Sequence, residues 1–192
     1  MFRRLRQLRA ADVQLYRLCD AAAGGLILLM VVFSPWAFGT TQTWAVRTMT
    51  GAAGLLGALL IVKLCIRKIK KYPAPRWDSA DQKNSPARAA TVTLAWLTVA
   101  LLLFCLVSAL NAAATYDPGK HFFSYHPHLN WLPHSFDSAR TWFYFWTYLG
   151  LAVAFWSVRD WLLGRTAAEE KNLHRPNPSA APALPARVRR LL

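Results

Sequence analysis

Hydrophobic residues are gathered along the chain into four long segments with few or no charged residues. Residues 21–43, 89–116 and 141–158 contain no Asp, Glu, Lys or Arg. The stretch 48–62 is shorter, but Arg47 and Lys63 at its edges can extend their charged ends outward along aliphatic stems. A helix of about 20 apolar residues crosses the bilayer core. A soluble helical bundle would instead show a polar stripe on each helix, and none of these segments has one.

The pattern therefore predicts an all-α, polytopic membrane protein with four transmembrane helices in two antiparallel hairpins. We expect spans at about 21–38, 45–66, 89–112 and 141–163, which together form a membrane domain over 21–163. Residues 1–20 read as a basic, amphipathic cytoplasmic segment that lies along the membrane surface. Residues 113–140 form a periplasmic loop, and residues 164–192 form a cytoplasmic tail rich in Pro and Ala, with further basic residues.

The positions of the basic residues give this topology an orientation. The net charge is +14, with 23 Lys and Arg. Only Arg47, Lys120 and Arg140 fall in the connections that follow the first and third spans, and the other basic residues flank the opposite ends. This alternation follows the positive-inside bias and places both termini in the cytoplasm. A nucleic-acid-binding surface has no reason to alternate with apolar spans, so we expect membrane lipids, especially anionic headgroups, as partners and no nucleic acid.

The second span carries small residues at four-residue spacing: Thr50, Gly54 and Ala58. Such a face lets two helix backbones approach closely. It would serve either homodimerisation or packing against another span of the same chain. We favour packing within the chain, because multi-span proteins need such contacts internally.

The loop 113–140 holds four of the five histidines, His121, His126, His128 and His134. They could offer imidazoles to a metal, but the loop has no cysteine and only Asp117 and Asp137 as carboxylates. One could act as a general base toward a hydroxyl group, and all of them could equally be interfacial side chains beside aromatic residues. We expect no metal site.

Candidate ligand-binding residues on the far side of the membrane are Arg47, Lys120, His134 and Arg140, whose charges could neutralise a diphosphate or an acidic glycan. Anchoring of helix ends explains the three basic residues equally well. Asp160 stands beside Arg159 and near Arg165, and we expect a structural role for it. The sequence has no P-loop, GxSxG, HExxH or dinucleotide fingerprint, so no cofactor is indicated. No carboxylate inside a span marks an ion path, which disfavours a transporter.

Four short stretches resemble bacterial O-antigen ligase- and polymerase-like membrane proteins. They are 34–45 (SPWAFGTTQTWA), 132–137 (LPHSFD), 159–163 (RDWLL) and 185–192 (PARVRRLL). The first looks like the first periplasmic turn of that family, although Thr40 stands where relatives often have a second glycine. The last looks like the cytoplasmic foot of a further span, so we expect this chain to be the front part of a larger protein.

The resemblance implies a glycosyltransferase of lipopolysaccharide biosynthesis in the bacterial inner membrane. Such an enzyme moves a glycan from a polyprenyl diphosphate carrier to a sugar hydroxyl. The functional arginines and histidine proposed for the family lie in a later periplasmic loop, so no catalytic residue is carried over to this chain. We therefore expect an N-terminal part without the catalytic half, whose partner would be that missing half or another membrane protein. The alternative is a non-enzymatic four-span accessory or assembly protein of the inner membrane.

Overall fold

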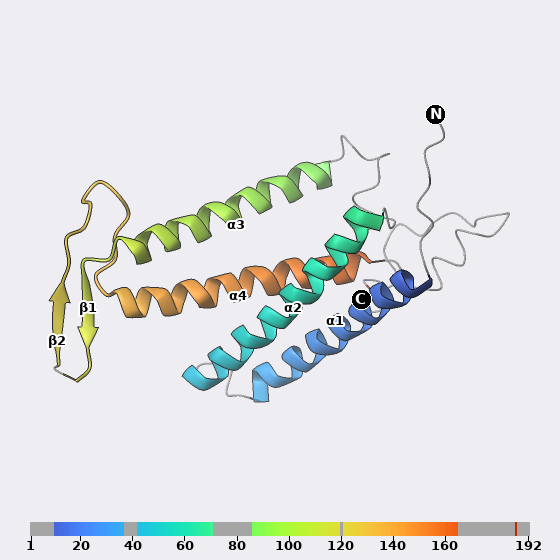
Figure 1. Ribbon diagram of the computed structural model, residues 1–192, viewed down its shortest axis with the longest axis horizontal. Helices are drawn as coiled ribbons and strands as arrows, with labels where there is room; N and C mark the ends of the chain where they lie inside the picture. Colours follow the sequence, from blue (N-terminus) through green and yellow to red (C-terminus); the bar gives the residue numbers. More distant parts are fainter. Residues whose placement is uncertain (1–9, 37–41, 71–85, 120, 165–186, 188–192) are drawn as a thin grey trace.

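The computed structural model of the chain describes residues 10–36, 42–70, 86–119, 121–164 and 187. Most of these residues lie in four helices (Figure 1): α1 (Ala10–Trp36), α2 (Thr43–Lys70), α3 (Pro86–Leu110) and α4 (Ser138–Leu163). Stretches of three of these helices, Val13–Trp36, Thr43–Ile69 and Arg88–Leu110, are long and apolar enough to cross a membrane. The chain is thus a mainly helical protein with at least three helices suited to a bilayer.

Helix α4 has 26 residues but is not among the three apolar enough to span. The reason lies in its composition, because its first half is dominated by Trp, Tyr and Thr and its last turns contain Arg159 and Asp160. Tryptophan and tyrosine bury large apolar surfaces yet carry one polar atom each, which suits them to the edge of a membrane.

Helix α4 nevertheless lies at the centre of the molecule, between α3 on one side and α2 on the other, while α1 packs mainly on α2 (Figure 1). The core is built from Ala23 and Ile27 of α1 and Leu56 of α2, with Val158 and Trp161 of α4 packed against them. Helix α3 exposes Trp96, Leu97, Leu101, Leu103 and Phe104 among other apolar side chains. An exposed apolar surface of this size marks contact with lipid or with another protein.

Helix α1 runs without interruption from Ala10 to Trp36 and includes Pro35 in its last turn. Residues 10–20, which we expected to form part of a separate surface segment, instead continue directly into the apolar part of the helix. Residues 1–9, the rest of that segment, lie outside the described residues. The structure thus extends one helix well past the predicted start of the first span.

The connection between α3 and α4 departs from the all-α prediction. It contains a two-stranded antiparallel sheet of β1 (Ala114–Asp117) and β2 (Phe122–Tyr125), in which Ala114 faces Tyr125 and Asp117 faces Phe122. The Asp117 side chain accepts a hydrogen bond of 2.9 Å from the Gly119 N–H, and His121 has a positive φ of 55° in the same turn. Aromatic and β-branched residues around such a turn favour a β-hairpin. After this hairpin, the Asp137 side chain caps the first turn of α4 by accepting from the Ala139 N–H.

Candidate functional site

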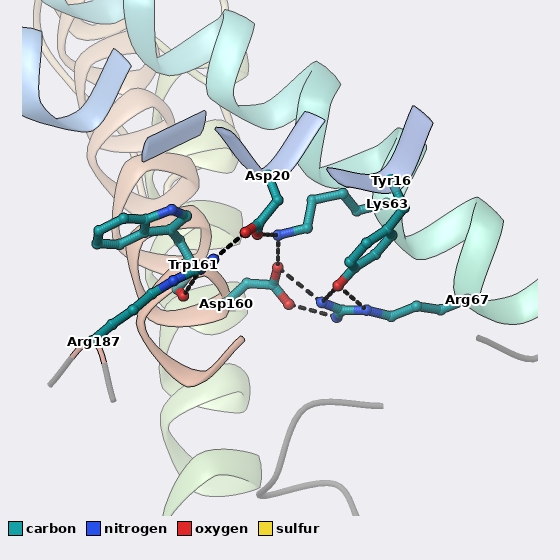
Figure 2. Close-up of polar contacts among 7 residues, drawn as sticks. All are labelled: Tyr16, Asp20, Lys63, Arg67, Asp160, Trp161 and Arg187. Carbon is teal, nitrogen blue, oxygen red and sulfur yellow. Dashed lines mark hydrogen bonds and ion pairs between the residues drawn. The ribbon is translucent and has the colours of Figure 1, made fainter. Parts of the chain in front are cut away.

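A network of charged side chains joins three helices at the end of the molecule where α1 begins and α2 and α4 end (Figure 2). It is made from Asp20 of α1, Lys63 and Arg67 of α2, Asp160 of α4, and Arg187 from the C-terminal region. Tyr16 and Trp161 supply the polar and aromatic surfaces around these charges. Because these positions lie as much as 167 residues apart in the sequence, only the fold brings them together.

Lys63 is the centre of the network. Its side chain is only 1% exposed, and its Nζ donates to Asp20 Oδ1 at 2.8 Å and to Asp160 Oδ2 at 2.7 Å. We expected this lysine to extend outward at the edge of its span, but it turns inward because both neighbouring helices present a carboxylate to it. A buried ammonium is tolerated when it is paired and hydrogen-bonded in this way.

Arg67 lies one helical turn after Lys63 and forms hydrogen bonds with both carboxylate oxygens of Asp160. Its Nη1 donates to Asp160 Oδ1 at 2.5 Å and its Nη2 to Oδ2 at 3.1 Å, a two-point contact of the kind that a planar guanidinium forms with a carboxylate. The Nε and Nη2 groups also donate to the Tyr16 hydroxyl at 3.1 and 2.6 Å. Arg67 therefore ties α2 to both α4 and α1.

Arg187 completes the network from beyond the end of α4. Its guanidinium pairs with Asp20 Oδ2 and donates to the Trp161 carbonyl at 2.5 Å. It also lies over the Trp161 ring, 4.7 Å from the ring centroid. This one side chain thus covers the last turn of α4 and bonds to α1.

The chemistry of the network is that of a clamp. Three cations meet two carboxylates, and all four carboxylate oxygens accept from a cation. The network therefore presents no free carboxylate to a substrate or metal, and its effect is to hold α1, α2 and α4 together. Asp160 pairs across helices with Lys63 and Arg67, whereas Arg159 donates to Thr91 Oγ1 of α3 at 2.8 Å. Arg165 lies outside the described residues.

At the opposite end of α3 and α4, the connecting loop is anchored by the side chain of Asn111. Its Nδ2 donates to the Leu129 carbonyl at 2.9 Å and its Oδ1 accepts from the Leu129 N–H at 2.8 Å. Ser135 Oγ donates to the Ser108 carbonyl at 3.0 Å, and the backbone of Ala114 bonds to that of Phe136. The loop is consequently a folded cap on the ends of α3 and α4.

The histidines of this cap lie in two places. His121 lies 3.3 Å from the Tyr116 hydroxyl, measured from Nδ1, while the rings of His128 and His134 are 5.0 Å apart, centroid to centroid. Within the described part of the chain, no group of three or more His, Cys, Asp or Glu side chains could hold a metal ion.

His134 lines a pocket of about 330 Å³ under the cap, between α3 and α4. Its other walls combine hydroxyl and aromatic groups, including Ser108, Thr141, Tyr144 and Tyr148. Among the candidate ligand-binding residues, His134 is the one that the structure places in this pocket. Arg47, near the start of α2, and Arg140, in the first turn of α4, are both exposed and do not line it, and Lys120 lies outside the described residues.

The contact between α2 and α4 shows where the small residues of α2 lie. A Cβ on Gly150 would come within 3.3 Å of Thr50 Cγ2, and a Cβ on Gly57 within 2.7 Å of Val153 Cγ1. On α2, Ala53 lies between Thr50 and Gly57 and is buried. Gly54, in contrast, has open space beside it, and Ala58 is exposed. Of the predicted face, Thr50 thus contacts α4, and Gly54 and Ala58 point away from the contacts within this chain.

Comparison of the chain with protein-family models, with curated proteins and with solved structures gives no match. The resemblance to O-antigen ligase-like proteins therefore rests on the four short stretches of sequence, and the site has to be interpreted from its own chemistry.

Proposed function

We propose that this chain is the N-terminal, scaffold part of an O-antigen ligase- or polymerase-like membrane glycosyltransferase that acts on polyprenyl-diphosphate-linked glycans. In this role it binds the glycan part of the lipid-linked donor or acceptor, and the catalytic groups belong to another part of the assembly. The proposal combines the sequence resemblance with the pocket under the α3–α4 cap.

The proposal includes four spans, with both termini on the cytoplasmic side of the bacterial inner membrane. Lys63, near the end of α2, bonds to Asp20, in the first half of α1, and to Asp160, near the end of α4. These bonds support a topology in which the start of α1 and the ends of α2 and α4 lie on one side of the membrane. The cap between α3 and α4 lies at the other end of the molecule (Figure 1), and the scarcity of basic residues there agrees with an external position.

The pocket lined by His134 is the observation that carries the proposed role. Tyr144 and Tyr148 offer aromatic rings and hydroxyl groups, while Ser108 and Thr141 add further polar atoms. A sugar presents apolar C–H faces and many hydroxyl groups, so walls of this mixed character suit it better than a purely apolar ligand. An imidazole nitrogen of His134 can take part in a hydrogen bond with a sugar hydroxyl.

The test uses the full chain in lipid nanodiscs and a polyprenyl-diphosphate-linked oligosaccharide that carries a photoreactive group on its sugar. After illumination, mass spectrometry should locate the cross-link on the pocket walls, near Ser108 or within 134–148. Tyr144→Ala should lower the yield about tenfold, a loss of contacts and aromatic surface equivalent to about 1.4 kcal/mol. Tyr125→Ala is the matched control, because Tyr125 is exposed on the same cap and does not line the pocket. Cross-links spread evenly over the exposed helices would contradict the proposal.

A second role, that of a non-enzymatic assembly or accessory protein, is favoured by the satisfied charge clamp. The clamp closes α1, α2 and α4 on one another, which allows the chain to fold as a unit and to serve a partner without binding glycan itself. That role predicts a defined partner after mild detergent extraction together with no glycan cross-linking in the pocket.

A further inference from the structure

Two neighbouring pockets between α1, α2 and α4 form one apolar groove. The first, of about 210 Å³, is lined by Val46 and Thr147 among others, and the second, of about 380 Å³, by Leu56 and Val158. Met30, Met49 and Ala154 line both pockets, so the two cavities lie side by side and together form the apolar groove. The groove lies on helices of which α1 and α2 are suited to a bilayer, where such a surface is in contact with lipid chains rather than with water.

The length of the groove matches one leaflet. Along α4 it extends from Thr147 to Val158, eleven helical steps of about 1.5 Å each, or about 16 Å. The hydrocarbon core of a bilayer is about 30 Å thick, so the groove covers roughly half of it. It ends at Leu56 and Val158, where α1, α2 and α4 close into the apolar core, and the charge clamp follows beyond. A lipid acyl chain that enters the groove must therefore come from the membrane leaflet on the side where α4 begins.

The two helices that line the open end of the groove, α2 and α4, each carry an arginine within two helical turns of a lining residue. Arg140 precedes Thr147 by seven residues, two turns of helix, and so lies on the same face of α4 about 10 Å nearer the membrane surface. Arg47 directly follows Val46 on α2. Both side chains are exposed, and neither forms an ion pair with a carboxylate among the described residues. Unpaired guanidinium groups at this position favour a phosphate.

We propose that the α1–α2–α4 groove binds one acyl chain of an anionic phospholipid from that leaflet, with the lipid phosphate beside Arg47 and Arg140. The lipid is then a fixed part of the bundle that fills the gap between helices which do not close on one another. This role is separate from glycan binding, because the groove and the His134 pocket share no lining residue.

The charge and shape of the site are tested by native mass spectrometry of the full chain after extraction from vesicles of equal phosphatidylglycerol and phosphatidylethanolamine. We expect one retained phosphatidylglycerol per chain. Ala154→Leu, which fills the groove, should lower retention about tenfold, whereas Ala100→Leu on the exposed surface of α3 should not change it. Arg140→Gln should lower the preference for phosphatidylglycerol about fivefold, and Lys68→Gln, an exposed residue near the other end of α2, should leave it unchanged.

The identity of the molecule in the groove is tested by photo-cross-linking. Two of the three methionines, Met30 and Met49, line the groove, and the third is Met1. Photo-methionine incorporated throughout the chain should therefore form a phospholipid adduct on α1 or α2, and the adduct should disappear in the Met30→Leu, Met49→Leu variant. Cross-linking of these positions to a second copy of the chain, or to a polyprenyl lipid in preference to phosphatidylglycerol, would overturn the proposal. Retention of phosphatidylglycerol by Ala154→Leu at the wild-type level would overturn it as well.

Discussion

At the scale of single residues, the buried ammonium of Lys63 is the group whose burial depends most on its partners. A charge removed from water is costly, and the cost is met here only because Asp20 and Asp160 both bond to it. Removing one partner of a buried ion pair leaves the other charges buried without compensation. This destabilises the protein more than replacing the whole pair with apolar residues would.

We therefore expect Lys63→Met, which keeps the length of the side chain but removes its charge, to destabilise the bundle by about 3–5 kcal/mol. The measurement is unfolding of the purified chain in mild detergent, followed by circular dichroism against increasing sodium dodecyl sulfate. Lys68→Met is the matched control, because Lys68 is exposed one turn further along the same helix. Equal stability of the two variants would show that the clamp does not hold the helices together.

Sequence reasoning assigned a structural role to Asp160 alone, expected Lys63 to extend outward, and did not single out Asp20. Lys63 and Arg67 are spaced by four residues, which places them on one face of a helix, and Asp20 and Asp160 are isolated carboxylates at the ends of apolar segments. That combination is a signal for an ion-pair network between helices. The sequence does not contain the relative rotation of α1, α2 and α4, which decides whether Lys63 extends outward or turns inward.

Asn111 offers a second test at this scale, because its amide makes both a donor and an acceptor contact with Leu129. Asn111→Asp keeps the size and the acceptor but removes the donor, so the Leu129 carbonyl loses its partner at a cost of about 0.5–1.5 kcal/mol. Hydrogen exchange of the amides in 126–134 should become faster as the cap loosens. Asn130→Ala, at an exposed position of the same loop, should leave the exchange rates as they are; faster exchange in that variant too would assign the effect to the loop in general.

At the scale of helices, the closest packing is between α2 and α4. A Cβ on Gly57 would approach Val153 Cγ1 to 2.7 Å, and Val153 cannot move away easily because a β-branched side chain is restricted to few rotamers. Gly54, three residues earlier, has open space beside it. Two glycines on one helix thus differ in their surroundings and little in their local backbone.

We expect Gly57→Ala to be less stable than Gly54→Ala by about 1–3 kcal/mol, the usual range for overpacking. Both variants gain the same helix propensity, so their difference isolates the contact with Val153. Unfolding in sodium dodecyl sulfate measures it, with the wild-type chain as reference. If Gly54→Ala were the more harmful change, the exposed face with Gly54 and Ala58 would be a contact surface between chains.

The helices themselves were largely predictable, since apolar runs at about 45–66 and 89–112 correspond to α2 (Thr43–Lys70) and α3 (Pro86–Leu110). The β1–β2 sheet was not predicted, because its two strands have only four residues each and depend on pairing with one another and on the bridge from Ala114 to Asp137. The sequence named His134 as a candidate ligand-binding residue, but it did not predict the pocket that His134 lines. The loop histidines stood out in the sequence, but the tyrosines that form its wall looked like interfacial anchors.

At the scale of the whole molecule, the main question is whether α4 crosses the membrane, because it is not among the three helices that are apolar enough to span. The clamp supports the proposed topology, in which α4 does cross. Asp160 bonds to Lys63, so the end of α4 lies at the surface where α2 ends, while its beginning joins the cap at the far end of α3. The aromatic and polar residues that lower its apolarity lie in its first half, near that cap, where an interfacial position is favourable for them.

Single cysteines at Tyr125, Ser79 and Arg165 test this arrangement in a background in which Cys19, Cys65 and Cys105 are replaced by alanine. A membrane-impermeant thiol reagent applied to spheroplasts should label the cysteine at 125 at once, because Tyr125 is exposed on the cap. The cysteines at 79 and 165 should react only after the inner membrane is breached, because the proposed four crossings would return the chain to the cytoplasmic side. Labelling of 165 together with 125 would mean that α4 does not cross. In that case the bond between Lys63 and Asp160 could not form, since the two residues would lie on opposite sides of the membrane.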